Sequence, residues 1–149
     1  MDMNGQDFFY QWEVLGEPVG KGRPRVTTRG GYAHAYTPKK TTEYEQQVRD
    51  AFYAKYGEVE MLEGVALELF VRMEHGIPKS VPKKDLPYYK DNLIKPMKKP
   101  DSDNVIKGVT DALNGYVFKD DVQIVYLIAS KRWSTEPKVV IQIREARDY

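Results

Sequence analysis

Alternation of apolar and polar residues predicts strands in two parts of the chain. Residues 65–73 carry an apolar side chain at every second position, and residues 139–143 repeat the pattern. Because successive side chains of a strand point to opposite faces of a sheet, each segment would bury one face and keep the other polar. Further strands are expected over residues 8–15, over a hairpin of residues 25–28 and 32–36, and over the nearly continuous apolar run 122–129, whose β-branched content predicts a central strand.

A repeat of three to four residues replaces the alternation in two other segments and predicts helices there. Thr42 and Glu45 form a capping-box pattern that would open the first helix, and Gly57 is a natural stop. The second helix is expected from about Ser102 to Asn114. The order of elements, β-β-β-α-β-α-β-β, predicts an α+β fold in which a mixed sheet carries two helices packed on one face.

Residues 77–100 show neither period and hold five prolines and seven lysines. This length is unusual for a connection in a compact domain, so the segment 77–99 is a functional loop, a mobile flap or an insertion with a short helix of its own. The rest of the 149 residues shows no internal repeat and no low-complexity tract. We therefore expect a single domain over residues 1–149.

The composition excludes several kinds of chemistry. The chain has no cysteine, so disulfides, thiolate metal sites and thiol nucleophiles are ruled out. No apolar run approaches the roughly 20 residues of a membrane span, and the polar, acidic N-terminus does not have the character of a signal peptide. These features favour a cytoplasmic protein without a membrane partner.

The net charge of +1 conceals a segregation of charges along the chain. Residues 21–40 contain six basic residues and no acidic one, and residues 79–99 contain seven lysines against two aspartates. Residues 41–68 between them contain seven acids against two bases. Two basic segments on a near-neutral protein suggest a local surface for a polyanion, although lysine-rich loops are also found where they are simply solvated.

The expected second helix has one polar face of unusual composition. At about 100° per residue, its apolar residues gather on one side, while Asp103, Lys107 and Asp111 follow one another on the other. This row is consistent with a catalytic face. It is equally consistent with an N-cap at Asp101 or Ser102 and an exposed ladder of ion pairs. An EF-hand is excluded, because Val105 and Ile106 stand where it needs an oxygen ligand and a glycine.

A second acidic cluster changes the balance between these interpretations. Asp120 and Asp121 precede the apolar run 122–129, where a helix-to-strand return could bring Asp121 beside Asp101 and Asp103. Taken alone, the pair is also typical of a polar turn. Three converging carboxylates would form a hard, all-oxygen site for Mg²⁺ or Mn²⁺, which suits phosphodiester hydrolysis by a metal-activated water. Lys107 could then stabilise charge on the scissile phosphate.

Together these segments resemble the RusA family of Holliday-junction resolvases, the crossover junction endodeoxyribonucleases. The resemblance lies in Pro100-Asp101-x-Asp103-Asn104-x-x-Lys107, Asp111-Ala112-Leu113-Asn114-Gly115 and Asp120-Asp121-x-Gln123-Ile124, with a weaker match in Gly16-x-Pro18-x-x-Lys21-x-Arg23-Pro24-Arg25. It implies a RusA-like fold and a homodimer that nicks four-way DNA junctions symmetrically with magnesium. It also implies roles in DNA recombination and repair, and no organic cofactor. Such enzymes are common in phages and prophages.

Carried over by position, the resemblance assigns roles to individual residues. Asp101 and Asp103 match the metal-binding pair, Lys107 matches an essential lysine, and Asp121 matches the third ligand, with Asp120 as the alternative. The basic residues around these positions are expected to contact DNA phosphates. They are Lys21, Arg23, Arg25, Arg29, Lys98 and Lys99.

The remaining polar and aromatic residues carry weaker signals. His34 and His75 are expected to be incidental polar residues, and Trp12 and Trp133 core residues, whereas Tyr32 and Tyr36 beside the basic hairpin are candidates for DNA contact. Two other functions stay open at this point. One is a protein that binds branched or single-stranded DNA without cutting it, and the other is an interaction protein whose acidic helix binds a basic partner.

Overall fold

The computed structural model describes residues 9–147, and every side chain among them except that of Arg29. Its centre is a four-stranded sheet in the order β1 (Tyr10–Leu15), β6 (Lys138–Glu145), β4 (Leu67–Gly76), β5 (Ile124–Ser134). β4 runs parallel to β5 and antiparallel to β6, and β1 runs antiparallel to β6. Phe8, at the start of the first expected strand, lies outside the described residues.

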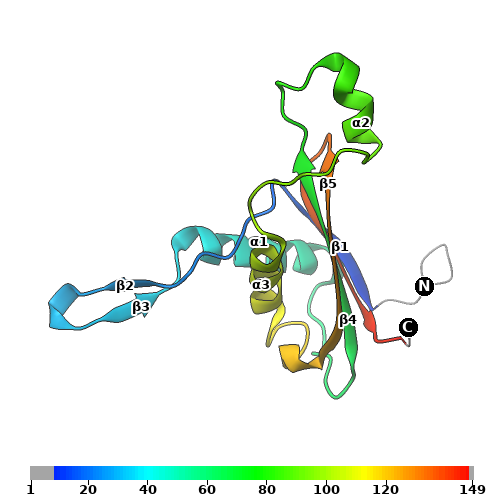
Figure 1. Ribbon diagram of the computed structural model, residues 1–149. Coiled ribbons are helices and arrows are strands. Elements are labelled where there is room, and N and C mark those ends of the chain that lie inside the picture. The colour runs from blue at the N-terminus through cyan, green and yellow to red at the C-terminus, as the bar shows by residue number, and fades with distance from the viewer. Residues whose placement is uncertain (1–8, 148–149) are drawn as a thin grey trace.

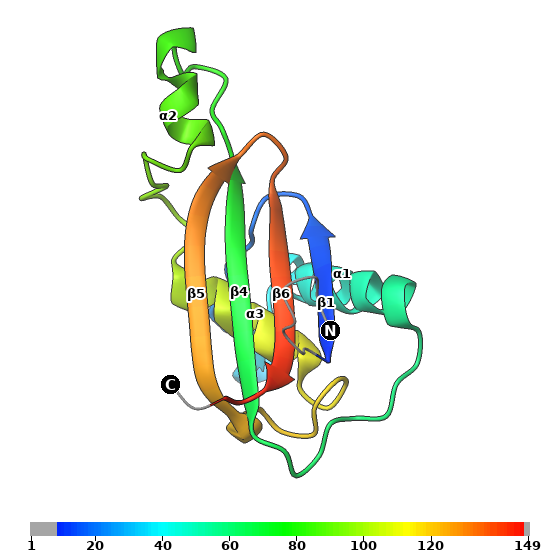
Figure 2. The same cartoon turned by 90° about the vertical axis from the view of Figure 1, so that its right-hand side faces the viewer.

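Two helices, α1 (Lys39–Tyr56) and α3 (Ser102–Leu113), cover the same face of this sheet (Figures 1 and 2). The predicted α+β fold, a mixed sheet with two helices on one face, is therefore confirmed. The alternation in β4 and β6 places their apolar residues under the helices, as expected for a half-buried sheet. These residues are Leu67, Leu69, Val71, Met73, Val139, Ile141 and Ile143.

Phe52 on α1 lies at the centre of an aromatic cluster that joins this helix to β1. Its ring centroid is 4.9 Å from those of Tyr10 and Trp12, in edge-to-face geometry that aromatic quadrupoles favour. The Trp12 indole N–H donates to the carbonyl of Val48 at 3.3 Å. Phe52 is fully buried, so the cluster fixes α1 on the sheet.

The predicted start of α1 is wrong. The helix begins at Lys39 with Pro38 as its N-cap, and the Thr42 hydroxyl donates to the carbonyl of Lys39 at 2.9 Å from inside the helix. The carbonyl of Pro38 accepts the N–H groups of Thr41 and Thr42. Because Pro38 is the N-cap and its carbonyl accepts the first helical bonds, Thr42 already lies inside the helix, and the Thr42–Glu45 pattern does not act as a capping box.

The apolar run 122–129 does contain a strand, but the prediction of a central strand is wrong. β5 lies at the edge of the sheet and extends to Ser134. Val125, Leu127 and Ile128 are 55%, 51% and 38% exposed. Apolar composition predicts burial without saying against what, and the part of the chain that the structure describes leaves these side chains open.

Two segments project from the body (Figure 1). β2 (Arg25–Thr27) and β3 (His34–Tyr36) pair as a separate two-stranded ribbon, which we call the arm. The proline- and lysine-rich segment between β4 and α3 contains a short helix, α2 (Leu86–Lys90), beyond the ends of β4 and β5. Residues 77–99 thus contain a short helix, as one of the three interpretations expected.

Among the described residues, no helix is both long enough and apolar enough to span a bilayer.

Candidate active site

α3 presents two faces, as its periodicity predicts. Val105, Val109 and Leu113 are fully buried against the sheet and α1. Asp103 and Lys107 lie on the exposed side of the same helix, one turn apart. The buried face anchors the helix, so the positions of its polar groups are set by the core.

A groove of about 400 Å³ separates the polar face of α3 from the start of β5. Asp103, Lys107 and Asp121 all line it, so three of the four predicted catalytic residues share one groove. The rest of its wall is mostly apolar, from Ile106, Thr110, Ile124, Val125 and Leu127. Charged groups on an apolar wall interact more strongly than they would in open water.

The two neighbouring aspartates before β5 have different roles. Asp120 is the N-cap of a single 3-10 turn over Asp121–Gln123: its carboxylate accepts the N–H of Val122 at 3.2 Å. Its own N–H donates to the Gln123 side chain at 3.1 Å, which completes a capping box. Asp120 therefore shapes the turn, whereas Asp121 lines the groove.

Asp101 does not share the groove with Asp103. It is the N-cap of α3, with extended backbone angles, and it lines a second pocket with Lys40, Lys99 and Asn104. Across residues 9–147 no three carboxylate or imidazole side chains lie close enough together to hold a metal ion. The predicted convergence of three carboxylates is thus seen for two of them. The reason is geometric, since residues two apart at a helix terminus point in different directions.

The N-terminal motif and the acidic helix, matched separately in the sequence, meet in the fold. The N–H of Lys21 donates to the carbonyl of Asn104 at 2.9 Å. Gly20 lies so close that an added Cβ would be 2.9 Å from Cβ of Pro100, which explains why this position has no side chain. The segment before the arm is therefore packed on the first turn of α3.

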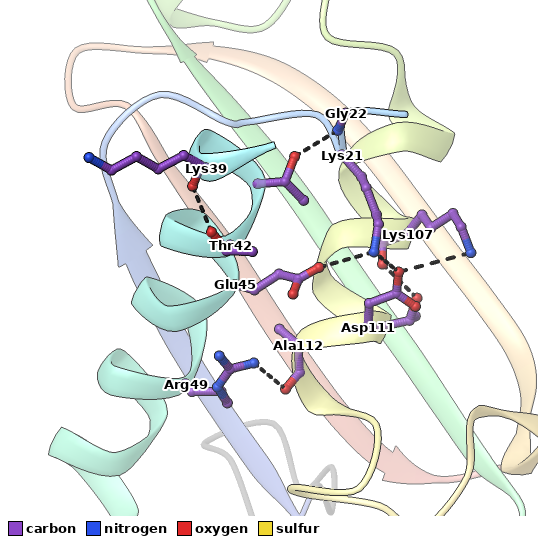
Figure 3. Close-up of polar contacts among 11 residues, drawn as sticks. Lys21, Gly22, Lys39, Thr42, Glu45, Arg49, Lys107, Asp111 and Ala112 are labelled. Atoms are coloured by element: carbon purple, nitrogen blue, oxygen red, sulfur yellow. Dashed lines mark hydrogen bonds and ion pairs between the residues drawn. The ribbon is translucent and has the colours of Figure 1, made fainter. Parts of the chain in front are cut away.

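Lys21 itself is held by two carboxylates rather than left free for DNA (Figure 3). Its ammonium contacts Asp111 on α3 and lies 3.2 Å from Glu45 on α1. Burial lowers the pKa of Lys21, but the hydrogen bonds and the attraction from Asp111 and Glu45 outweigh it and raise that pKa above its ordinary value. Lys21 was expected to contact a DNA phosphate. In this structure it forms a charged link between α1 and α3.

Asp111 is shared by two lysines. Besides Lys21, the ammonium of Lys107 lies 4.0 Å from its carboxylate, and the Lys107 side chain is 67% exposed (Figure 3). An exposed pair at this distance contributes little energy. Because Lys21 already neutralises Asp111, Lys107 keeps its positive charge available to the groove.

The other expected DNA contacts surround the site. Arg23 and Arg25 are exposed where the chain enters the arm, and Lys98 and Lys99 are exposed just before α3. The Lys98 ammonium lies 5.9 Å from the centre of the Trp133 ring. Arg29 lies at the tip of the arm, and its side chain lies outside the described residues.

Lys131 on β5 was not singled out by the sequence. Its ammonium donates to the carbonyl of Lys98 at 2.6 Å and to that of Pro100 at 3.1 Å. It thereby ties residues 98–100, which we call the strap, to the strand that begins beside Asp121. The sequence signal that could have identified Lys131 is its position on the helix-facing side of a largely apolar strand. A charged group there needs a polar partner.

His75 is buried beneath the segment that carries α2, at 1% exposure. Its Nδ1 lies 3.7 Å from a carboxylate oxygen of Glu17. Burial lowers the pKa of His75, Lys131 and Lys98 lower it further, and the attraction of the half-exposed Glu17 does not offset them. The lowered pKa favours the neutral imidazole, which suits a packed side chain. His75 is buried and does not line the groove, so it is not a candidate general base there.

Two carboxylates and an exposed lysine beside basic segments are the combination expected of a protein that acts on phosphate polyanions. Residues 16–144 match the family described as Endodeoxyribonuclease RusA. The chain is also 40% identical over 137 residues to the uncharacterized protein YqaN of Bacillus subtilis (strain 168), covering 91% of this chain and 95% of that protein. The chain belongs to the RusA family of endodeoxyribonucleases, which confirms the resemblance drawn from the acidic motifs.

Proposed function

We propose that this protein is a magnesium-dependent endonuclease that resolves four-way (Holliday) DNA junctions by paired symmetric nicks. The observation that carries the proposal is the groove in which Asp103, Lys107 and Asp121 face one space between α3 and β5. Membership of the RusA family supports action on DNA, and the basic segments 21–40 and 79–99 supply the counter-charges that a nuclease needs.

The donor set of the groove fits magnesium. This ion prefers oxygen ligands and is commonly bound through one or two carboxylates, several waters and the phosphates of the substrate, without a complete cage of protein ligands. Asp103 and Asp121 would hold it, and Mn²⁺ could take its place; Asp101 lines the other pocket and is not included in this ligand set. When bound, the ion would supply an activated water and neutralise charge on the phosphate.

Lys107 is proposed to hold the scissile phosphate. Its ammonium is exposed, one helical turn from Asp103, and its only described ion pair is the weak one with Asp111. Lys21 occupies that aspartate more closely, so Lys107 can turn to a phosphate oxygen without leaving a carboxylate unpaired. A cation already in place stabilises the charge that develops as the water attacks.

Two cuts in one junction call for two such grooves, and we propose a homodimer with two-fold symmetry as their source. Ile128 on the edge strand β5 is 38% exposed and lies on the face opposite Leu127 of the groove, and this exposed apolar position supports the interface. The apolar face of α1 is used in the core and does not contribute to this interface. We expect Ile128→Lys to shift the protein toward monomer in sedimentation equilibrium, whereas a wild-type monomer would contradict the dimer.

The test of the proposed function is cleavage of a labelled four-way junction with magnesium and with chelator. Asp103→Asn and Asp121→Asn should abolish cutting and keep binding, because they remove ligands and also remove negative charge that faces the DNA. Asp50→Asn, on the exposed side of α1, is the matched control and should cut normally. Junction binding by the wild type without cutting in Mg²⁺ or Mn²⁺ would leave a branched-DNA binding protein in place of a nuclease.

A further inference from the structure

The arm carries a surface that the fold itself does not use. None of the residues from Arg25 to Tyr36 belongs to the described hydrophobic core. Val26, Tyr32 and Tyr36 are nevertheless 67%, 73% and 48% exposed. An isolated two-stranded ribbon gains little stability of its own, so exposed aromatic residues on it are better explained by something that they contact.

The pairing of the two strands sorts the side chains of the arm onto two faces. Arg25 lies opposite Tyr36 and Thr27 lies opposite His34, and these directly opposed residues share one face. The ring of Tyr32 lies 6.5 Å from that of His34 in edge-on geometry, which places Tyr32 beside the same face. One face of the arm is thus basic and aromatic; we call it the aromatic face.

The base of the arm is firmly attached to the body. The N–H of Gly22 donates to the Thr41 hydroxyl at 2.9 Å (Figure 3). A Cβ at Gly22 would lie 3.0 Å from Pro38, so the two chain segments entering and leaving the arm are closely packed. Lys21, immediately before, is bound to Asp111 of α3. The base of the arm is therefore joined to the helix that carries Asp103.

We propose that the aromatic face of the arm stacks on bases at the branch point of DNA and so selects branched over linear DNA. This inference rests on the proposed function, which supplies branched DNA as the substrate. Residues 21–40 contain six basic residues and no acidic one, so the surroundings of the arm attract a polyanion. Bases that have already lost a stacking neighbour cost the least to unstack, and an aromatic ring accepts any of them.

A second copy of this chain is the other possible occupant of the arm. The charge of the arm argues against it, because the same excess of positive charge would face itself across a two-fold axis if two arms met. The edge strand β5 also offers an apolar surface without such repulsion. Phosphate contacts alone would explain the arginines but not the exposed tyrosines.

The experiment measures binding of a four-way junction that carries 2-aminopurine at the branch point. The Asp103→Asn background prevents cutting, and a linear duplex of equal length is measured beside the junction. Tyr32→Ala with Tyr36→Ala should abolish the fluorescence change on binding. It should weaken junction binding by roughly 5- to 150-fold for each stacked base that is lost, with duplex binding unchanged. Tyr32→Phe with Tyr36→Phe should restore both, and Tyr53→Ala on α1 is the control for an exposed tyrosine elsewhere.

Equal weakening of junction and duplex binding would overturn the inference and reduce the arm to a phosphate contact. A change from dimer to monomer in the alanine variant would overturn it in favour of a subunit contact. Failure of the proposed function is a separate result: it would appear as wild-type protein that does not cut the junction. The 2-aminopurine signal and the preference for junction over duplex are read independently of cutting.

Discussion

Replacement of Lys131 by methionine tests how the strap positions the groove. The ammonium of Lys131 donates to the carbonyls of Lys98 and Pro100, directly before Asp101 and the first turn of α3. The same strand begins beside Asp121, so this one side chain joins the two walls of the groove. Methionine keeps the approximate length of the side chain and removes the donor.

The expected effect follows from these two hydrogen bonds. A hydrogen bond from a charged donor contributes about 1.5–3 kcal/mol, and the lower end applies here because the bond to Lys98 is exposed. A loss of about 2 kcal/mol would lower the equilibrium constant for docking of the strap on β5 by roughly 30-fold. A small misplacement of catalytic groups costs up to about 10² in rate, so we expect single-turnover cleavage to fall by roughly 10- to 100-fold.

Two measurements distinguish a positioning role of Lys131 from a direct contact with DNA. One is the rate of single-turnover cleavage at saturating junction, and the other is junction binding in the absence of divalent metal. Cleavage should fall while the dissociation constant stays within about twofold, because the ammonium is engaged with the backbone. Lys131→Arg should recover most of the rate. Lys138→Met, which removes a strand lysine paired with Glu13, is the control. Normal cleavage by Lys131→Met, or a loss confined to binding, would refute the reasoning.

Three further outcomes are expected. Lys107→Ala should slow cleavage by about 10²–10³ with little loss of binding, measured under single-turnover conditions, and normal cutting would make it a surface residue only. Phe52→Ala should lower the free energy of unfolding by about 3–5 kcal/mol in urea denaturation, because it empties the centre of the aromatic cluster. The lowered pKa of His75 means that the unfolded chain takes up a proton at about pH 6.5 that the folded chain does not, so stability is full above that pH and falls as the pH drops below it. His75→Gln should flatten the loss of stability between pH 7 and pH 5, and the exposed His34→Gln should not.

Local periodicity accounts for what the sequence could predict. The alternation in β4 and β6 and the two faces of α3 follow from backbone geometry that acts over a few residues, and these elements form as expected. The edge position of β5 could not be read in this way, because an apolar strand has the same composition whether its cover comes from its own chain or from elsewhere.

The same distinction between local patterns and long-range contacts applies to the candidate site. The motif placed Asp103, Lys107 and Asp121 together, because one helix and one turn carry all three. The engagement of Lys21 with Asp111 and Glu45 depends on contacts between residues 24 and 90 positions apart, which no local pattern encodes. The role of Asp120 in its turn was visible in principle, since Gln123 stands three residues later as a capping box requires.

Treatment of a supercoiled plasmid that extrudes a cruciform measures the central claim most directly. Two symmetric nicks across the four-way junction convert the circle to a linear product, whereas a single nick leaves an open circle. We predict linear product from the wild-type protein with Mg²⁺, none with chelator, and none from Asp103→Asn or Asp121→Asn. Uncut plasmid, open circles alone, or linear product from Asp103→Asn at the wild-type rate would contradict the account.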